Sequence, residues 1–189
     1  MPRFADYHRT VVGYHGVRRS VALEIVQGAQ DYNRSENPDD WLGHGVYFWE
    51  YAPKQAWAWA DQRRLSHGWD EEVAVLASMI RLANCFDLLD PDHLRELSGI
   101  RQEYESKERL MGRAPKQNYN KSKHLDCAVF QFAYASLEAK GSPVDTCRAV
   151  FVPSHRRMWN RSGVYKSAHI QLCVRNPASI LGTWLVKPQ

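Results

Sequence analysis

The sequence predicts an α+β domain with largely antiparallel sheets, and three observations lead to this fold class. Runs of β-branched and aromatic residues are mixed with runs of helical periodicity, without the regular strand–helix rhythm of a parallel sheet. The C-terminal part contains three consecutive strand-like runs. The 189 residues, 44% of them hydrophobic, suit a single domain over 1–189, because no Pro-, Gly- or Ser-rich linker divides them.

Residue type and periodicity place six segments in the first half of the chain. Apolar residues at helical spacing follow the strand-like run that ends at Gly16, and Gly28 stands where a helix would end. A glycine-rich stretch then leads into aromatic and β-branched residues, after which Pro53 suits the first turn of an Ala- and Trp-rich helix. The expected segments are strands over 11–16, 42–49 and 72–81, helices over 17–27 and from 53 onward, and a polar, flap-like loop over 31–40.

The second half is predicted to contain two helices and three strands. Asp90 suits the N-cap of a helix whose apolar residues share one face, and Gly141 ends the helix that follows. Strict alternation in the middle strand puts His169 and Gln171 on the face opposite Leu172. The expected segments are helices from 91 and around 125–137, and strands over 147–152, 168–175 and 179–186.

Charge, cysteines and hydropathy narrow the function classes. The net charge of +4 favours nucleic-acid binding only slightly. Clusters such as Arg18–Arg19 and Arg156–Arg157 suit phosphate contacts, but each of them is more often plain solvated surface charge. Four cysteines lie far apart, which favours buried reduced thiols over disulfides. We find no signal-like segment, no apolar run near the ~20 residues that span a bilayer, and no metal-ligand spacing. We therefore expect a cytoplasmic protein with no membrane partner and no metal.

Two short motifs are candidates for a binding site. Tyr14-His15-Gly16 ends the first strand, where a histidine offers a directed hydrogen bond and a glycine lets a ligand approach the backbone. The run Gly-His-Gly-Val-Tyr that ends at Tyr47 permits a tight turn and presents a flat ring. Taken alone, each motif is more often structural, as a strand-end histidine or as core packing.

In this order and spacing, the two motifs resemble the poly(ADP-ribose) polymerase-like, or diphtheria-toxin-like, ADP-ribosyltransferases. The shared pattern is Tyr-His-Gly, an amphipathic helix, a polar loop and Leu-Gly-x-Gly-x-Tyr-Phe, and the resemblance extends over residues 11–186. It implies a split pair of mostly antiparallel sheets flanked by helices, with an NAD+ cleft between the sheets. It also implies cleavage of NAD+, as substrate, at the nicotinamide bond.

The resemblance assigns a role to each residue of the two motifs. His15 is expected to hydrogen-bond the adenosine-side ribose, and the backbone of Gly16 to hold the nicotinamide amide. Tyr47 is expected to stack on the nicotinamide ring. The family often has a second stacking tyrosine in the next helix, where this chain has an alanine, so the neighbouring Trp57 and Trp59 are the candidates for a second wall.

The third signature residue is a glutamate in the family and is expected to be Gln171 here. Counting back nine positions from Ile180, where the last strand begins, gives Gln171, with His169 as a further cofactor contact on the same strand face. A glutamine accepts the same hydrogen bond from the nicotinamide ribose but brings no charge to the oxocarbenium-like state. A polar residue on a solvated strand face is the alternative. If the match holds, transfer of a single unit is favoured over polymer growth.

We therefore expect a mono-ADP-ribosyltransferase with His15, Tyr47 and Gln171 as catalytic residues. Its acceptor would be a protein or a nucleic acid, with a slight tilt toward nucleic acid from the basic clusters. The compact form is similar to small bacterial toxins or defence effectors, which implies an antitoxin partner. Two alternatives stay open. One is a catalytically inactive NAD+- or ADP-ribose-binding module. The other is an NAD+-consuming RNA 2′-phosphotransferase, which shares the fold but has basic residues beside its histidine.

Overall fold

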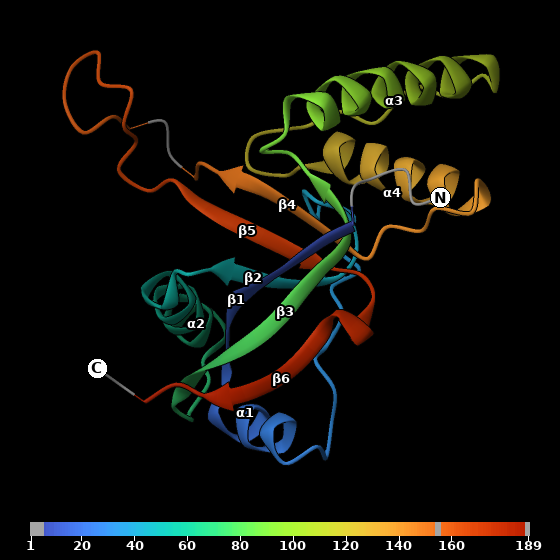
Figure 1. The fold of residues 1–189 in the computed structure, drawn as a ribbon. Helices are drawn as coiled ribbons and strands as arrows, with labels where there is room; N and C mark the ends of the chain where they lie inside the picture. The colour runs from blue at the N-terminus through green and yellow to red at the C-terminus, as the bar shows by residue number, and fades with distance from the viewer. Residues whose placement is uncertain (1–5, 154–155, 188–189) are drawn as a thin grey trace.

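The computed structural model describes residues 6–153 and 156–187, and it confirms the predicted α+β class (Figure 1). In these two ranges the chain forms six strands, four helices and a short 3-10 turn at Pro177–Ser179. The strands are β1 (Asp6–Arg18), β2 (Val46–Glu50), β3 (Val73–Asp87), β4 (Thr146–Phe151), β5 (His169–Val174) and β6 (Ile180–Leu185). The helices are α1 (Arg19–Val26), α2 (Pro53–His67), α3 (Pro91–Leu110) and α4 (His124–Ala139).

Strand pairing closes five of the strands into a ring. β1 pairs with β2 and with β3, β2 with β5, β5 with β4, and β4 with β3, while β6 adds to β3. The predicted antiparallel character is confirmed for every pair except β3–β4, which the α3–α4 crossover makes parallel. The two separate sheets implied by the resemblance are not seen in the described ranges. β1 and β3, with 13 and 15 residues, are long enough to pair on both sides and join all strands into one mixed sheet.

Apolar side chains from β1, β2, β3 and β5 fill the inside of the ring. Because side chains alternate along a strand, Phe48 of β2 points inward while its neighbours Tyr47 and Trp49 join other clusters on the outer face. Burial of this inner cluster fixes the register, since a slip of one residue would turn every apolar side chain outward. Its buried members are Val11, Val46, Phe48, Ile80, Leu82, Cys85, Leu172 and Val174.

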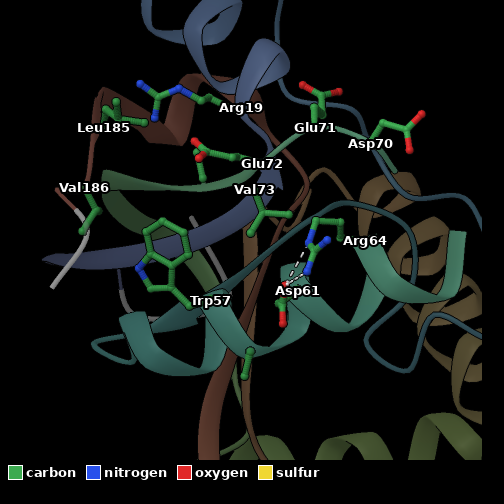
Figure 2. Close-up of a pocket in the computed structure, with 12 residues that line it drawn as sticks. Arg19, Trp57, Asp61, Arg64, Asp70, Glu71, Glu72, Val73, Leu185 and Val186 are labelled. Atoms are coloured by element: carbon green, nitrogen blue, oxygen red, sulfur yellow. Dashed lines mark hydrogen bonds and ion pairs between the residues drawn. The ribbon is translucent and has the colours of Figure 1, made fainter. Parts of the chain in front are cut away.

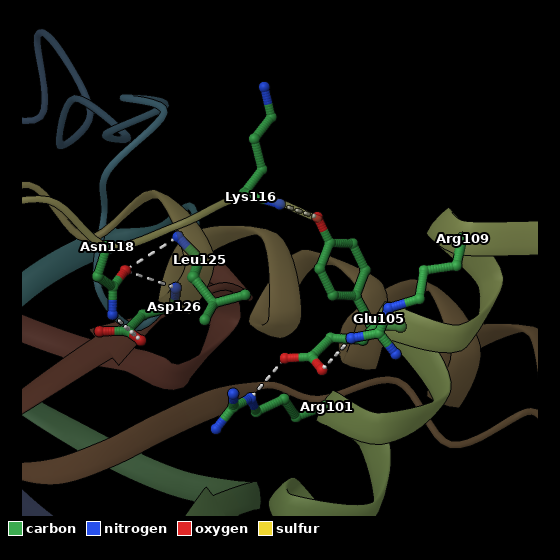
Figure 3. A network of polar contacts seen from close by, with 8 residues as sticks. Arg101, Glu105, Arg109, Lys116, Asn118, Leu125 and Asp126 are labelled. Atoms are coloured by element: carbon green, nitrogen blue, oxygen red, sulfur yellow. Dashed lines mark hydrogen bonds and ion pairs between the residues drawn. The ribbon is translucent and has the colours of Figure 1, made fainter. Parts of the chain in front are cut away.

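Helices α3 and α4 lie side by side at one end of the molecule, and the second large core lies between them and the sheet (Figure 1). Asn118, in the segment between the two helices, caps the start of α4. Its Oδ1 accepts hydrogen bonds from the backbone N–H groups of Leu125 (2.9 Å) and Asp126 (3.2 Å). Figure 3 shows this cap beside the Arg101–Glu105–Arg109 ion pairs, which span single turns of α3.

Most predicted helix ends are confirmed by their local chemistry. The Asp90 side chain accepts from the Asp92 N–H at 2.8 Å and so caps α3, and Pro53 opens α2. Gly28 and Gly141 both have positive φ just after a helix. The predicted flap over 31–40 is held in place, because Ser35 exchanges two backbone hydrogen bonds with Gly45 and Tyr32 packs against the inner cluster.

A buried ionic triad lies at one end of the ring. Arg148 of β4 donates from Nη2 to Glu50 Oε1 at 2.9 Å and from Nη1 to Asp87 Oδ2 at 3.1 Å, and all three side chains are almost fully buried. Burial raises the pKa of Glu50, and the Arg148 charge opposes that rise. The triad couples the end of β2 to the end of β3.

Three predictions that concern the whole chain can be compared with the described residues. The four cysteines are free and buried, as predicted. In the described ranges, no helix combines the length and the apolar character that crossing a bilayer requires. The same ranges contain no group of three or more His, Cys, Asp or Glu side chains arranged to hold a metal ion.

Candidate functional site

His15 lies where β1 and β2 separate. The last register pair of the two strands joins Tyr14 to Trp49, and beyond it β1 continues beside β3 alone. The imidazole bridges the separation, with Nδ1 at 2.7 Å from the backbone oxygen of Tyr47. Since a carbonyl oxygen only accepts, Nδ1 carries the proton and the neutral ring keeps Nε2 as an acceptor.

The surroundings of His15 keep its ring neutral. Burial lowers the pKa of His15, the hydrogen bond to Tyr47 opposes this, and the charge of Arg63 adds to the lowering. The ring packs against Tyr32 and Phe48, with centroids 5.2 and 5.5 Å away. Among the described residues, the Tyr47 carbonyl is the only hydrogen-bond partner of the imidazole. Nε2 is thus available to accept a hydrogen bond from a ligand.

Gly16 directs its backbone groups into the same separation. Arg19 N–H bonds to Glu72 of the β3 side, whereas the Val12 carbonyl accepts from Tyr51 at the β2 side. Because backbone groups alternate along a strand, the N–H and C=O of Gly16 point in the same direction as those of Val12. Gly16 lies beyond the last register pair of β1 and β2. Its N–H donor and its C=O acceptor therefore both face the gap that opens between these two strands.

Helix α2 packs directly against the face of Gly16 from which a side chain would project, so this position excludes a side chain. A Cβ at Gly16 would lie 2.4 Å from the carbonyl oxygen of Ala56 and 2.8 Å from Ala60 Cβ. Gly16→Ala is therefore expected to push α2 away and lower the free energy of unfolding by about 1–3 kcal/mol. Urea unfolding measures this loss.

The matched control for that substitution is Gly99→Ala in α3, where an added Cβ meets nothing within 4 Å. There alanine is expected to raise stability by up to about 1 kcal/mol, because it favours a helix more than glycine does. An unchanged unfolding curve for Gly16→Ala would show that α2 adapts freely and that its packing does not fix this glycine.

Tyr47 anchors the glycine-rich loop that precedes β2. Its hydroxyl donates to the Gly43 carbonyl at 2.7 Å and accepts from the Leu42 N–H at 3.0 Å. Gly43 has φ +75°, and a Cβ there would lie 2.7 Å from the ring of Tyr134. The turn at Gly43 is why β2 begins at Val46 and not at the predicted residue 42. Side chains alternate along β2, so the Tyr47 ring lies on the face opposite Phe48. The contact between Tyr47 and His15 is made by the Tyr47 backbone carbonyl and not by its ring.

Gln171 lies at the centre of an outer sheet face. Gln171 belongs to β5, which lies between β2 and β4. Its register partners are Trp49 of β2 on one side and Ala149 of β4 on the other. The indole Nε1 of Trp41 donates a hydrogen bond to Gln171 Oε1 at 2.6 Å. The predicted strand face of Gln171 is confirmed, and its amide oxygen already has a partner within the chain.

His169 lies on the same face, and both of its ring nitrogens have partners. Nδ1 donates to the Ser167 carbonyl at 3.0 Å, and Nε2 accepts from the indole N–H of Trp49 at 3.2 Å. Burial lowers the pKa of His169, while the bond to Ser167 opposes this. The imidazole ring also packs against Phe151, with centroids 5.4 Å apart.

The lowered pKa values of His15 and His169 make a testable prediction about acid stability. An unfolded chain takes up these two protons near pH 6.5, while the folded chain resists them to lower pH. The unfolded state therefore binds more protons below about pH 6.5, and stability is expected to fall as the pH drops from 7 toward 5. Urea unfolding across this range measures the slope. A His15→Gln, His169→Gln double variant is expected to flatten it, and an equally steep slope in that variant would contradict the assignment.

Trp57 and Trp59 lie on different sides of α2. Trp59 packs against Trp49, with ring centroids 5.4 Å apart, and so extends the face that carries Gln171. Trp57 stands on one wall of a pocket of about 660 Å³, beside the Asp61–Arg64 ion pair (Figure 2). Both rings also pack against the buried cluster of Trp49, Ala56 and Val75, so both stay candidates for a second wall.

Sequence reasoning did not assign roles to Trp41 and Trp49. Trp41 also packs against Phe151, with centroids 5.0 Å apart, so it lies over the β4–β5 edge of the Gln171 face. The sequence feature that could have pointed to Trp41 is its position directly before the Leu-Gly-x-Gly run. Comparisons with protein-family models, with curated proteins and with solved structures found no match to this chain. The case for a function therefore depends on the geometry of the site.

Proposed function

We propose that this chain is an NAD+-dependent mono-ADP-ribosyltransferase with an ADP-ribosyltransferase-like fold, and that NAD+ binds where β1 and β2 separate. The observation that carries the proposal is the 2.7 Å hydrogen bond from His15 Nδ1 to the Tyr47 carbonyl. It joins the two motifs across 32 residues and leaves Nε2 as an acceptor for a ribose hydroxyl. No side chain of the described residues takes up this acceptor.

The backbone of Gly16 supports the same location for nicotinamide. A carboxamide offers one acceptor oxygen and an NH2 donor, and the N–H and C=O of Gly16 offer the complementary pair in one direction. Trp57 and Trp59 pack with Ala56, whose carbonyl oxygen lies against Gly16, and the Tyr47 ring lies on the same face of β2 as Trp49, so these rings are the flat apolar surfaces that we propose for a planar heterocycle. Loss of nicotinamide from NAD+ held in this way would leave an electrophilic ribose, which a nucleophile on the acceptor attacks.

The strand neighbours of Gln171 support single transfer over polymer growth. Trp49, Ala149, His169 and Cys173 surround it on its face of the sheet, and none of them is a carboxylate that activates a ribose hydroxyl. The acceptor we propose is a macromolecule, a protein or a nucleic acid. Basic residues in the segment before β5 favour nucleic acid, because Arg156, Arg157, Arg161 and Lys166 occur there without an acidic residue among residues 156–166.

The test is to incubate the purified chain with NAD+ labelled in its adenylate part, in the presence of a whole-cell lysate. We expect release of free nicotinamide and transfer of label to a macromolecule. Separate digestions with protease and with nuclease then identify the class of acceptor. Absence of both nicotinamide release and transferred label, in a folded protein, would contradict the proposal.

One observation favours a second candidate, a binding module without turnover. The Gln171 carbonyl is already bonded to Trp41, so the position lacks both the charge and the unshared oxygen of a glutamate. In this case calorimetry would detect NAD+ or ADP-ribose binding that depends on His15, while no nicotinamide is released.

A further inference from the structure

The Trp41–Gln171 contact fixes the orientation of the glutamine amide. An indole N–H only donates, so the atom that it meets at 2.6 Å is the amide oxygen and not the nitrogen. A flip of the amide would place two donors against each other and lose the bond. Trp41 is itself held by ring packing against Phe151. The NH2 end of Gln171 therefore points away from Trp41.

The NH2 group of Gln171 is available to a ligand. Gln171 is half-buried, and among the described residues no side chain or backbone group accepts a hydrogen bond from its Nε2. Gln171 Nε2 is also absent from the set of buried side-chain atoms that lack a partner, so solvent reaches this nitrogen. The Gln171 NH2 group can thus donate a hydrogen bond to a ligand, whereas an ionised glutamate at this position could only accept one.

Among the residues that the structure describes, the neighbours of Gln171 include no base that could take a proton from a hydroxyl. Both nitrogens of His169 are engaged, and the accepting nitrogen is held by Trp49. Burial raises the pKa of Cys173 to about 12, so its thiol stays protonated. The His15 ring contacts Phe48 on the other face of β2. A nucleophile that meets this face must already carry its negative charge.

We propose that Trp41 is a positioning residue that fixes the Gln171 amide with its NH2 available on the outer face of β5, and that this donor orients an oxyanion nucleophile of the acceptor as it approaches bound NAD+. This inference rests on the proposed function. The oxyanion oxygen forms a bond to C1′ of the nicotinamide ribose while the C1′–N bond breaks. The electron pair of the broken bond stays on nicotinamide, which leaves as a neutral molecule. No proton is transferred, so the step needs no general base.

The experiment measures how small nucleophiles compete for ADP-ribose. Phenyl phosphate and benzoate carry an oxyanion, and benzyl alcohol carries a neutral hydroxyl on a similar ring. The chain is incubated with labelled NAD+ and equal concentrations of the three probes, and each adduct is quantified. We expect the oxyanion adducts to exceed the benzyl alcohol adduct by about tenfold, the effect of one hydrogen bond to a charged group. The phosphate-to-benzoate ratio shows which oxyanion is preferred.

Two substitutions assign this preference to the amide. Trp41→Phe keeps the ring but removes the N–H, so the amide can flip, and the oxyanion-to-alcohol ratio is expected to fall several-fold. Gln171→Glu keeps an acceptor for Trp41 but puts a carboxylate beside the nucleophile, and the ratio is expected to fall at least about tenfold. Trp184→Phe, at a half-exposed indole of β6, is the matched control and should leave the ratio unchanged.

The double variant separates positioning from a general structural effect. In the Gln171→Glu background, Trp41→Phe should change the ratio no further, because a carboxylate presents an oxygen in either orientation. An equal effect of Trp41→Phe in both backgrounds, or a wild-type preference for benzyl alcohol, would overturn the inference alone. Absence of nicotinamide release from NAD+ by the wild-type chain would instead overturn the proposed function and this inference with it.

Discussion

Replacing His15 by alanine is expected to reduce nicotinamide release by about 100-fold while the chain stays folded. The change removes the Nε2 acceptor and the bond to Tyr47 that aligns the two motifs, and loss of one well-placed hydrogen bond to a reacting ligand is worth up to about two orders of magnitude. Loss of a single polar contact at a strand end rarely unfolds a domain. Initial rates of nicotinamide release measure the effect, and circular dichroism checks the fold.

His67→Ala supplies the matched control for this prediction. His67 is an exposed histidine at the end of α2, and within the described part of the chain its side chain hydrogen-bonds only to Ser66 and Arg63 of the same helix. Its removal is expected to leave the rate within about twofold of wild type, because surface substitutions change little. A His15→Ala variant with an unchanged rate would take His15 out of the site. A variant that unfolds would show that its role is structural.

Arg148→Met is expected to lower the free energy of unfolding by about 3–5 kcal/mol, the largest stability change that the structure predicts. The substitution would leave the carboxylates of Glu50 and Asp87 buried without the cation that both of them contact. An uncompensated charge in the interior costs far more than the lost attraction between exposed ions. Urea unfolding at neutral pH measures the loss.

Arg95→Met serves as the control for the buried triad, because its ion pair with Asp92 is about three-quarters exposed on both sides. This change is expected to cost less than about 0.5 kcal/mol. The Arg148→Met variant should regain stability when Glu50→Gln is added, since one of the two uncompensated charges is then removed. A cost below about 1 kcal/mol for Arg148→Met would mean that water reaches the triad and solvates it.

The helices could be predicted closely from the sequence, whereas the full length of the strands could not. Helix ends depend on local chemistry, such as the cap at Asp90 and the glycine at Gly28. β3 was expected to end at residue 81 but runs to Asp87. Ala83 takes a φ of +49° near a register shift, and the residues after it pair with β4. Such a bend, and the ring that it helps to close, depends on strands far away in the sequence.

In the candidate site, the residue types could be predicted but their partners could not. His15 and Tyr47 were assigned as a pair, yet the atom that joins them is a backbone carbonyl, which no residue pattern displays. Alternation gave the correct face for Gln171, but the Trp41 indole that holds it comes from a loop. Loop conformation is set by tertiary contacts, and this is where the sequence is least informative.

The closed ring also sets the order in which the site can form during folding. Its two halves meet only when β5 joins β2, which brings Gln171 opposite Trp49 across most of the chain length. β3 also contacts residues that are distant in the sequence: its Ser78 hydrogen-bonds to Thr183 of β6, 105 residues away. Contacts of such long range make folding slow, on a scale of about milliseconds to seconds. During synthesis the growing chain would carry His15 and Tyr47 early, but the complete site would assemble only after β5 has been made and has joined β2.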